Sequence, residues 1–179
     1  MNKQLKVFAE TPRLILREVV LDDAEGMLEL DSDPEVHLYL PDRVIETVEE
    51  AKQSILDIRK QYKQFGIGRW SMIEKESGDF IGWAGLKWNV GPENNRMHFH
   101  DVGYRLIKKY WGKGYATEAA IASVKYAFND MAIRELIGVA DSRNIASVRV
   151  LQKAGMKYIE TFYEDDIPLY WYSLKKDDF

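Results

Sequence analysis

Apolar and polar residues follow one another along this chain in patterns that predict both strands and helices. Short runs rich in β-branched and aromatic residues, bounded by turn residues such as glycine and asparagine, are typical of strands. The runs that fit this description are residues 13–19, 68–76, 80–88, 98–107, 134–141, 156–163 and 169–176. The last two runs predict a terminal hairpin.

A second pattern, with apolar residues three or four residues apart, predicts helices. It is longest over residues 47–66, where Thr47 and Glu50 have the spacing of a capping box and Gly66 can close the helix. Shorter helices are expected from Asp22, from the Asp33-Pro34 pair through residues 33–40, over residues 120–128 and over residues 146–155.

The order of these elements indicates the fold class. One strand precedes helices, three strands follow, and a helix, a strand, a second helix and two strands complete the order. An antiparallel meander followed by a β-α-β unit is typical of a mixed α/β sheet of the α+β kind. Since no linker, repeat or low-complexity tract interrupts this order, we expect residues 1–179 to form a single domain. Residues 1–10 would be an N-terminal extension or the lead-in to the first strand.

Composition and charge narrow the function. The chain has 25 Lys and Arg residues against 29 Asp and Glu residues, a net charge of −4, so it lacks the basic excess of nucleic-acid-binding proteins. Cysteine is absent, which excludes disulfides, thiolate metal sites and a cysteine nucleophile. We find no signal peptide and no apolar run of the roughly 20 residues that cross a membrane. The chain is therefore expected to be cytoplasmic, with no nucleic-acid or membrane partner.

Residues 110–119, YWGKGYATEA, connect a predicted strand to a predicted helix through two glycines. They lack the GxxxxGK[ST] and GxGxxG patterns, but the physical basis of both patterns still applies. Glycines let a ligand approach the backbone, and the unpaired amides at a helix start bind phosphate. The alternative is a tight turn in which the glycines serve backbone geometry alone. On the first reading, a diphosphate is held by Gly112, Lys113, Gly114, Tyr115, Ala116 and Thr117.

The context of this loop resembles a known family. The loop, and a later segment of the form N-x-x-S-x-x-x-x-x-K-x-G, resemble two motifs of the GCN5-related N-acetyltransferases (GNAT). The likeness is strongest to the branch of ribosomal-protein alanine acetyltransferases and includes TPRLILRE at residues 11–18. It departs from the family pattern at Lys109, where glutamine or arginine is usual. The residues that match the second motif are Asn144, Ser147, Lys153 and Gly155.

The resemblance implies a fold and a cosubstrate. The fold would be a mixed, mainly antiparallel twisted sheet of about six to seven strands, flanked by helices and split by a central V-shaped gap. Acetyl-coenzyme A would be the acyl donor, with its diphosphate on the glycine loop and its pantetheine arm beside Leu106 and Ile107. The chain would be an acyltransferase that moves an acetyl group to a primary amine.

Acetyl transfer to an amine needs a base for the amine, stabilisation of the oxyanion and a proton for the departing thiolate. Without cysteine, direct attack by the amine is the simplest mechanism. Asn144 is a favoured N-cap residue, and the resemblance adds a contact between its carboxamide and the pantetheine amides. By resemblance, Ser147 faces the thiolate and can donate a proton to it; the alternative is a capping or exposed serine. Tyr158 is a lesser candidate for the same role.

The sequence identifies the general base for the amine less clearly than the proton donor for the thiolate. Asp101 lies on the strand before the loop, where the branch often has glutamate, and we predict that it acts as the base, directly or through water. His100, Glu118 and Glu164 are alternatives, although a carboxylate at residue 118 would also favour the helix dipole. His98, His100 and Asp101 together could suggest a metal site, but two histidines are few and the resemblance implies no metal.

The chemistry of the acceptor favours an α-amine. At pH 7 roughly a tenth of α-amino groups, but only about 0.04% of lysine side chains, are neutral, so an enzyme for protein N-termini can use a weak base. A protein N-terminus, such as that of a ribosomal protein, is slightly favoured over a small amine (an amino acid, polyamine or aminoglycoside). A third alternative is a non-catalytic acyl-coenzyme A sensor. The acidic segment 160–166 could attract a cationic acceptor, and the chain could be a monomer or, through its terminal hairpin, a homodimer.

Overall fold

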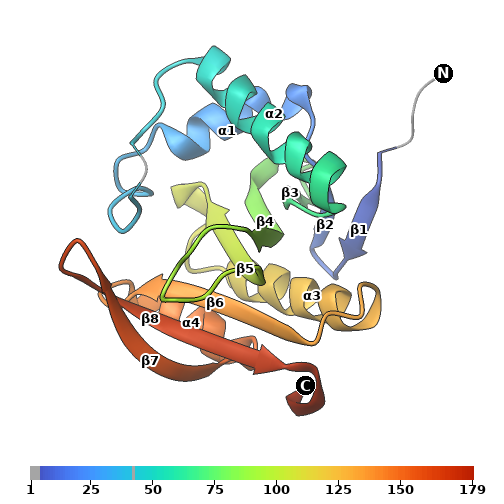
Figure 1. Ribbon diagram of the computed structural model, residues 1–179. Helices are drawn as coiled ribbons and strands as arrows, with labels where there is room; N and C mark the ends of the chain where they lie inside the picture. Colours follow the sequence, from blue (N-terminus) through green and yellow to red (C-terminus); the bar gives the residue numbers. More distant parts are fainter. Residues whose placement is uncertain (1–4, 42) are drawn as a thin grey trace.

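In the computed structural model, which describes residues 5–41 and 43–179, the strands form one eight-stranded sheet (Figure 1). The order across the sheet is β1-β2-β3-β4-β5-β6-β8-β7, and neighbouring strands are antiparallel except for β5 and β6. The strands are β1 (Val7–Glu10), β2 (Leu14–Glu18), β3 (Arg69–Glu74), β4 (Phe80–Asn89), β5 (Phe99–Leu106), β6 (Glu135–Asp141), β7 (Lys157–Glu164) and β8 (Ile167–Lys175). The α-helices are α1 (Ala24–Asp31), α2 (Val48–Phe65), α3 (Tyr115–Asn129) and α4 (Ile145–Lys153).

The predicted mixed, mainly antiparallel sheet is confirmed, with eight strands in the described residues instead of six to seven. The additional strand is β1, which lies within residues 1–10 and pairs with β2. The sequence does not predict it, because β1 has four residues and buries only Phe8. The ring of Phe8 stacks on Trp70 with 4.7 Å between ring centroids. A contact between residues far apart in sequence therefore fixes this strand.

The helix predicted over residues 33–40 is wrong, because these residues form consecutive turns. Their hydrogen bonds span three residues, as from the Val36 amide to the Asp33 carbonyl (3.0 Å). Pro41 explains the difference in part, since the residue before a proline is disfavoured in the helical region. In addition, the Ile45 amide donates to the Asp31 carbonyl (3.0 Å), which draws the segment back to the end of α1.

Where the end signals are local, the predicted helices are confirmed. Thr47 caps α2 by accepting from the Glu50 amide, with the reciprocal contact of a capping box, and Gly66 ends the helix at φ +70°. Gly155 follows α4 in the same way, at φ +87°. No helix in the described part of the chain has both the length and the apolar character needed to cross a membrane.

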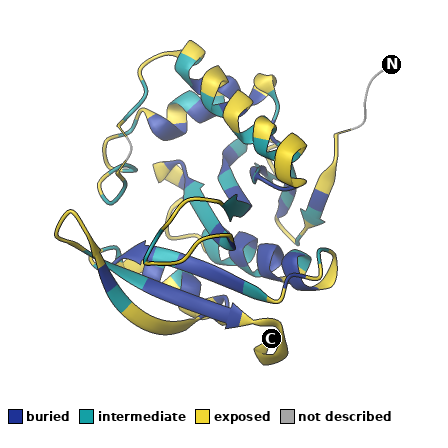
Figure 2. Ribbon diagram, viewed as in Figure 1, coloured by how far each residue is buried: buried dark blue, intermediate teal, exposed yellow. Residues whose placement is uncertain are grey.

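The helices cover both faces of the sheet. α1 and α2 lie together on one side, whereas α3 and α4 lie on the other (Figure 1). α3 is mostly buried, while the outward side of α2 is exposed (Figure 2). On the C-terminal half of the sheet, a second apolar cluster contains Phe99, Ile137, Phe162 and Trp171. Because the faces of the sheet are covered in this way, we expect ligands to bind where neighbouring strands separate.

The main opening lies between β5 and β6. These strands pair in parallel at Asp101 and Ile137. β5 then continues along β4 as far as Leu106, and β6 continues along β8 as far as Asp141. Figure 1 shows the two strands pointing apart. The divergence corresponds to the V-shaped gap that we predicted.

Candidate functional site

A glycine loop joins β5 to α3. The chain makes one 3₁₀ turn (η2, Lys108–Tyr110) and passes through exposed residues 111–114 into the helix. Gly112 and Gly114 have φ values of +75° and +84°, in the left-handed region that favours glycine. No described residue accepts a hydrogen bond from the amides of residues 112–117. Since these amides lie at the positive end of α3, they can bind an anion.

Side chains from the segment just before β2 hold this loop in place. Arg13 donates from Nε to Oε2 of Glu118 (2.7 Å) and from Nη1 to the Lys113 carbonyl (2.9 Å). Thr11 donates to Oε1 of Glu118 (2.6 Å), and the Arg13 guanidinium lies 4.4 Å from the centroid of the Tyr115 ring. Burial alone would raise the pKa of Glu118, but the hydrogen bonds from Thr11 and Arg13 outweigh it and lower the pKa overall. Glu118 is therefore better suited to anchor the loop than to act as a base.

The backbone of β5 faces the gap at its C-terminal end. The Ile107 amide donates to the Ile81 carbonyl (3.0 Å), and the Ile107 carbonyl accepts from the Tyr110 amide (2.9 Å). Because alternate residues of an antiparallel strand bond to opposite neighbours, the backbone groups of Leu106 point away from β4. The Leu106 carbonyl accepts from Nε1 of Trp111 (2.8 Å). An extended ligand arm could thus bond to the Leu106 amide, whereas Ile107 has only its side chain to offer.

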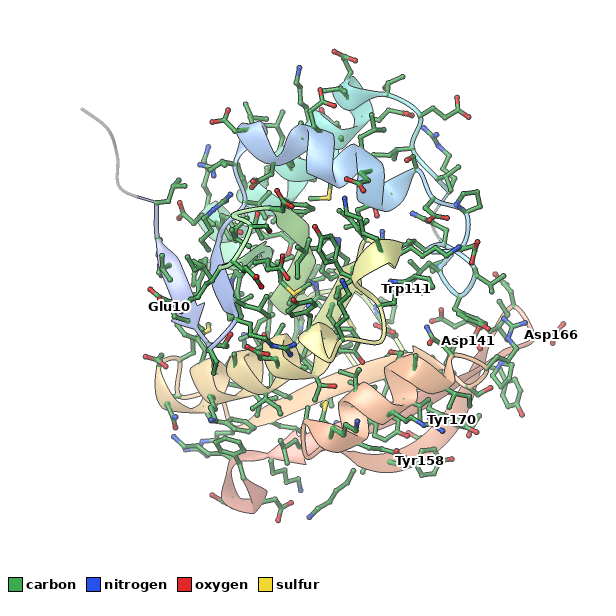
Figure 3. All side chains as sticks on the ribbon, turned by 180° about the vertical axis from the view of Figure 1, so that it is seen from behind. Glu10, Trp111, Asp141, Tyr158, Asp166 and Tyr170 are labelled. Atoms are coloured by element: carbon green, nitrogen blue, oxygen red, sulfur yellow. The ribbon has the colours of Figure 1, made fainter. Side chains whose placement is uncertain are left out.

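The N-terminus of α4 lies across the gap from β5. Asn144 caps this helix, with its Oδ1 accepting from the Ser147 amide (3.1 Å), which leaves its Nδ2 for another partner. The hydroxyl of Ser147 lies 3.0 Å from that of Tyr104, which donates to the Ser147 carbonyl (2.9 Å). Burial raises the pKa of Tyr104, so its hydroxyl stays protonated. In Figure 3, Asp141 marks the end of β6, just before α4 begins.

The opposite face of β5 carries an ion pair. Asp101 and Tyr104 are an odd number of residues apart, so their side chains lie on opposite faces of the strand. Oδ1 of Asp101 lies 2.9 Å from Nη2 of Arg69, and both side chains are mostly buried. The guanidinium groups of Arg69 and Arg105 lie 5.3 and 5.1 Å from the ring centroid of Trp83. An amine that approached Asp101 would have to compete with Arg69.

The rings of His98 and His100 both lie beside the ring of Trp88. The ring centroid of Trp88 lies 4.5 Å from that of His100 and 6.1 Å from that of His98. Burial lowers the pKa of His100, although the charge of Asp101 opposes the shift. Within the described residues there is no group of three or more His, Asp or Glu side chains that could hold a metal ion.

Tyr158, the lesser candidate for proton donor, lies on the exposed strand β7. Its hydroxyl is 2.9 Å from Oγ1 of Thr161, and its ring centroid is 5.4 Å from that of Tyr170 (Figure 3). No hydrogen bond in the described part of the chain connects it to Ser147. The geometry therefore favours Ser147 for this role.

A family model described as "Acetyltransferase (GNAT) domain" matches residues 13–157, which is most of the chain. The chain belongs to the GNAT acetyltransferases. Two relatives agree with this. The uncharacterized N-acetyltransferase p20 of Bacillus licheniformis is 30% identical over 175 residues, covering 94% of this chain and 96% of that protein. The FsC-acetyl coenzyme A-N(2)-transacetylase of Aspergillus fumigatus is 32% identical over 157 residues, covering 86% of this chain and 66% of that protein.

Solved structures of GNAT proteins share this fold. An acetyltransferase from Bacillus anthracis has a TM-score of 0.77 and 26% identity, covering 97% of this chain and 98% of that chain. The ribosomal-protein-S5-alanine acetyltransferase of Vibrio fischeri has a TM-score of 0.78 and 21% identity, covering 95% of this chain and 97% of that chain. The resemblance to ribosomal-protein acetyltransferases therefore extends to the fold, and the chain is an acyltransferase that uses acetyl-coenzyme A.

The glycine loop fits the coenzyme of a GNAT enzyme. A Cβ atom at Gly112 would meet no other residue within 4 Å, so a diphosphate can approach the backbone there. Lys113 adds a cation, with its Nζ 5.2 Å from the Tyr110 ring centroid. The Leu106 amide and the Asn144 carboxamide remain for the pantetheine arm, and the bound coenzyme supplies an activated thioester. We still predict, residue by residue, that the coenzyme contacts residues 112–117, Leu106, Ile107, Asn144 and Ser147.

Three residues that organise this GNAT site are not assigned from the sequence. They are Arg13, Arg69 and Tyr104, and their partners lie 105, 32 and 43 residues away in the chain. Arg13 belongs to the TPRLILRE segment and Tyr104 to the strand before the loop, so both fall within the stretches that carry the family resemblance. Only the packed structure shows what each side chain contacts.

Replacing Arg13 with methionine should raise the KM for acetyl-coenzyme A about tenfold and leave kcat nearly unchanged, because the loop loses its anchor while the reacting groups stay in place. Methionine keeps an apolar contact with Tyr115. Steady-state kinetics with varied coenzyme would measure the effect. Lys75→Met, which removes a surface ion pair with Glu10, is the matched control. Equal KM values in the two variants would contradict the anchoring role.

Proposed function

We propose that this GNAT enzyme transfers the acetyl group of acetyl-coenzyme A to the α-amine of a peptide or protein N-terminus. The observation that carries the proposal is that Asp101, the carboxylate that the sequence predicts as the base, is paired with Arg69. An α-amine needs little help to lose its proton, whereas a lysine amine needs much. The likeness to the ribosomal-protein-S5-alanine acetyltransferase of Vibrio fischeri supports the same acceptor class.

A small-molecule amine is the second candidate. The name of the Aspergillus fumigatus relative specifies an N(2)-transacetylase, and this relative is more similar in sequence than the ribosomal enzyme. The chemistry at the nitrogen is the same for both acceptors. The two candidates therefore differ in what surrounds the amine and in how much of the acceptor the enzyme must contact.

In the proposed reaction, the amine nitrogen attacks the thioester carbonyl carbon while the coenzyme is held by the glycine loop and β5. A new C–N bond forms and the C–S bond breaks. Ser147 stands at the start of α4, where its hydroxyl can donate to the departing sulfur, and the hydroxyl of Tyr104 lies 3.0 Å from it across the gap. Asp101, which the sequence predicts as the base, would have to give up its ion pair with Arg69 in order to contact the amine directly.

Replacing Ser147 with alanine should lower kcat about 100-fold while leaving the affinity for acetyl-coenzyme A within about twofold, because general acids typically contribute 10²–10⁴-fold. The lower end applies since a thiolate is a good leaving group. Free-thiol release and calorimetric titration of the coenzyme would measure the two quantities. A variant with the turnover of the wild type would rule out Ser147 as proton donor.

A panel of acceptors tests the function itself. Free-thiol release would be followed with N-terminal peptides that begin with alanine or serine, with the same peptides blocked at the N-terminus, and with amino acids, polyamines and aminoglycosides. We expect turnover with the free peptides, which blocking abolishes. Turnover with small amines alone would replace the proposal with the second candidate. A thermal shift by acetyl-coenzyme A without turnover of any acceptor would identify a non-catalytic coenzyme-binding protein.

A further inference from the structure

The loop between β4 and β5 is fastened across the C-terminal half of the sheet. Nδ2 of Asn94 donates to Oε1 of Glu160 on β7 (2.9 Å). The guanidinium of Arg96 lies 5.8 Å from the ring centroid of Trp171 on β8, and its Nη1 lies 3.5 Å from Oε2 of Glu135 on β6. The loop thus lies over the face of the sheet that carries Asp101 and away from α3.

Within this loop a tight turn holds Glu93. The Glu93 amide donates to the Arg96 carbonyl, and the Arg96 amide donates to the Glu93 carbonyl, both at 2.9 Å. Asn94 and Asn95 between them have φ values of +46° and +58°, which a two-residue turn of the I′ type needs and asparagine tolerates. The backbone of Glu93 is therefore fixed even though the residue lies in a loop.

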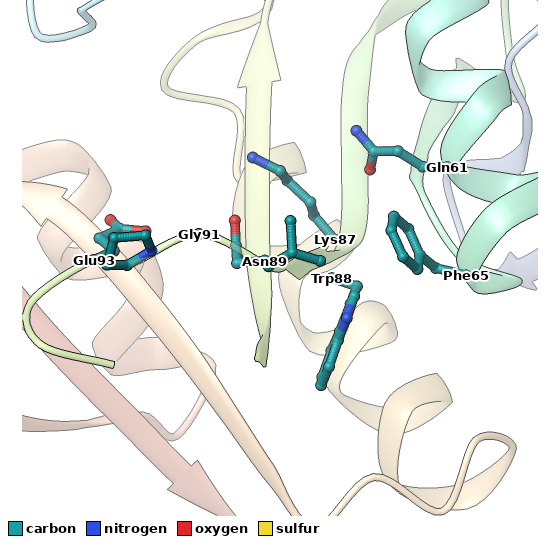
Figure 4. A pocket seen from close by; sticks show the side chains of 9 residues that line it. Gln61, Phe65, Lys87, Trp88, Asn89, Gly91 and Glu93 are labelled. Atoms are coloured by element: carbon teal, nitrogen blue, oxygen red, sulfur yellow. The ribbon is translucent and has the colours of Figure 1, made fainter. Parts of the chain in front are cut away.

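Glu93 lies between two open recesses. The first has a volume of about 340 Å³ and is bounded by the end of α2 and the start of the loop, including Gln61, Phe65 and Trp88 (Figure 4). The second has a volume of about 370 Å³ and includes Tyr163 of β7 and its neighbours. Glu93 lines both recesses. A group at this place can meet a ligand that enters from either side.

The surroundings of Glu93 favour the uptake of a proton. Burial raises its pKa, and the negative charges of Asp101 and Glu164 raise it further. The cations that face it, Lys87 and Arg69, oppose the shift but do not cancel it. Within the described residues, no hydrogen bond is donated to its carboxylate. A carboxylate with a raised pKa that accepts no hydrogen bond from a described residue is suited to general base catalysis.

We infer that Glu93 accepts the proton that the attacking amine releases, with the acceptor bound in the recesses on either side of it. In this step the nitrogen forms its bond to the thioester carbonyl carbon, the C–S bond breaks, and the proton lost by nitrogen moves to the carboxylate of Glu93. The thiolate takes its proton from water or from Ser147, which regains one from solvent, and Glu93 returns its proton to solvent. This inference rests on the proposed function and adds to it the group that takes the proton.

The other carboxylates near the site fit this role less well. Asp101 is engaged by Arg69, and its charge serves to raise the proton affinity of Glu93. Glu118 is bound by Thr11 and Arg13 beside the glycine loop. Glu93 combines a fixed backbone, an open recess and an unbonded carboxylate.

The test is the dependence of kcat on pH for the best acceptor of the panel. In the wild type, kcat should fall on acidification as Glu93 becomes protonated, because only the carboxylate form takes up a proton. Glu93→Gln should lower kcat at pH 7 at least tenfold and remove this acidic limb, while the limb due to the acceptor amine and the KM for acetyl-coenzyme A stay. Asp101→Asn should keep the acidic limb but move it to lower pH, because a negative neighbour is lost.

Controls separate this role from a structural one. Glu25→Gln, an exposed change on α1, should leave the profile unaltered. Should Glu93→Gln fail to fold, Glu93→Asp takes its place. This variant should keep the acidic limb of the pH profile, but its kcat should be roughly tenfold lower because the carboxylate is one methylene further away. Wild-type kcat in either Glu93 variant would overturn the inference, as would loss of the acidic limb in Asp101→Asn alone. Those results leave acetyl transfer intact, whereas a wild-type chain that acetylates no acceptor contradicts the proposed function instead.

Discussion

Replacing Gly114 with glutamate is expected to weaken the binding of acetyl-coenzyme A about 100-fold, and turnover at cellular coenzyme concentrations should disappear with it. Two unit charges about 4 Å apart near a protein surface repel by about 4 kcal/mol, roughly 1,000-fold in affinity. The guanidinium of Arg13 would lie 3.5 Å from the new Cβ and would offset part of this repulsion. The left-handed φ of +84° adds strain to the loop. Calorimetric titration with acetyl-coenzyme A measures the loss.

Gly66→Glu is the matched control for this variant. Gly66 also has a left-handed φ, +70°, and open space around it, but it ends α2 on the other side of the sheet. It receives the same charge and a similar strain, so its affinity for the coenzyme should equal that of the wild type. If Gly114→Glu bound the coenzyme as tightly as Gly66→Glu, the diphosphate would not lie on the glycine loop.

Replacing Asp23 with alanine is expected to lower the free energy of unfolding by about 3–5 kcal/mol, because it leaves a buried guanidinium without its partner. Asp23 is 5% exposed and accepts from Nη1 and Nη2 of Arg17 at 2.9 and 2.7 Å. It also accepts from the Val20 amide (2.9 Å) and from the Ser71 hydroxyl (2.7 Å). The Asp23 carboxylate thus connects β2, the turn before α1, and β3 by hydrogen bonds. Urea denaturation measures the change.

The neighbouring residue provides the control. Asp22→Ala removes an exposed carboxylate from the same turn, and we expect a change within about 0.5 kcal/mol. A loss of less than about 1 kcal/mol in Asp23→Ala would show that the network around Arg17 contributes little to stability. Both variants should keep the wild-type affinity for acetyl-coenzyme A in the folded state, since the network lies apart from the glycine loop.

The sequence predicts those parts of the fold whose signals are local. The spacing of Thr47 and Glu50 is enough to place the start of α2, and the two glycines around Lys113 are enough to predict exposed amides at the start of α3. The failure over residues 33–40 has the opposite cause. The Asp33-Pro34 pair is a good helix start, but the residues after it are held by a contact between Ile45 and Asp31 that no local pattern reveals.

The same distinction between local signals and distant contacts applies to the candidate site. The coenzyme side is encoded in short motifs, so Gly112, Gly114 and Asn144 can be selected from the sequence alone. On the acceptor side, the environment of each carboxylate decides its role, and that environment comes from strands distant in sequence. Asp101 is selected by its place in a motif, yet only the structure shows Arg69 beside it. Glu93 belongs to no motif, and its surroundings become visible only when β7 and the loop after β4 are brought together.

The order β6-β8-β7 has a consequence for folding. β7 precedes β8 in the chain, yet among the described strands it pairs only with β8, which fills the place next to β6. Until β8 pairs with β6, the segment that becomes β7 has no strand to pair with, and Phe162, which is 9% exposed in the folded protein, lacks its contact with Trp171. A chain that ends before Ile167 would therefore leave residues 157–164 unpaired, and such a segment can pair with a strand of another molecule.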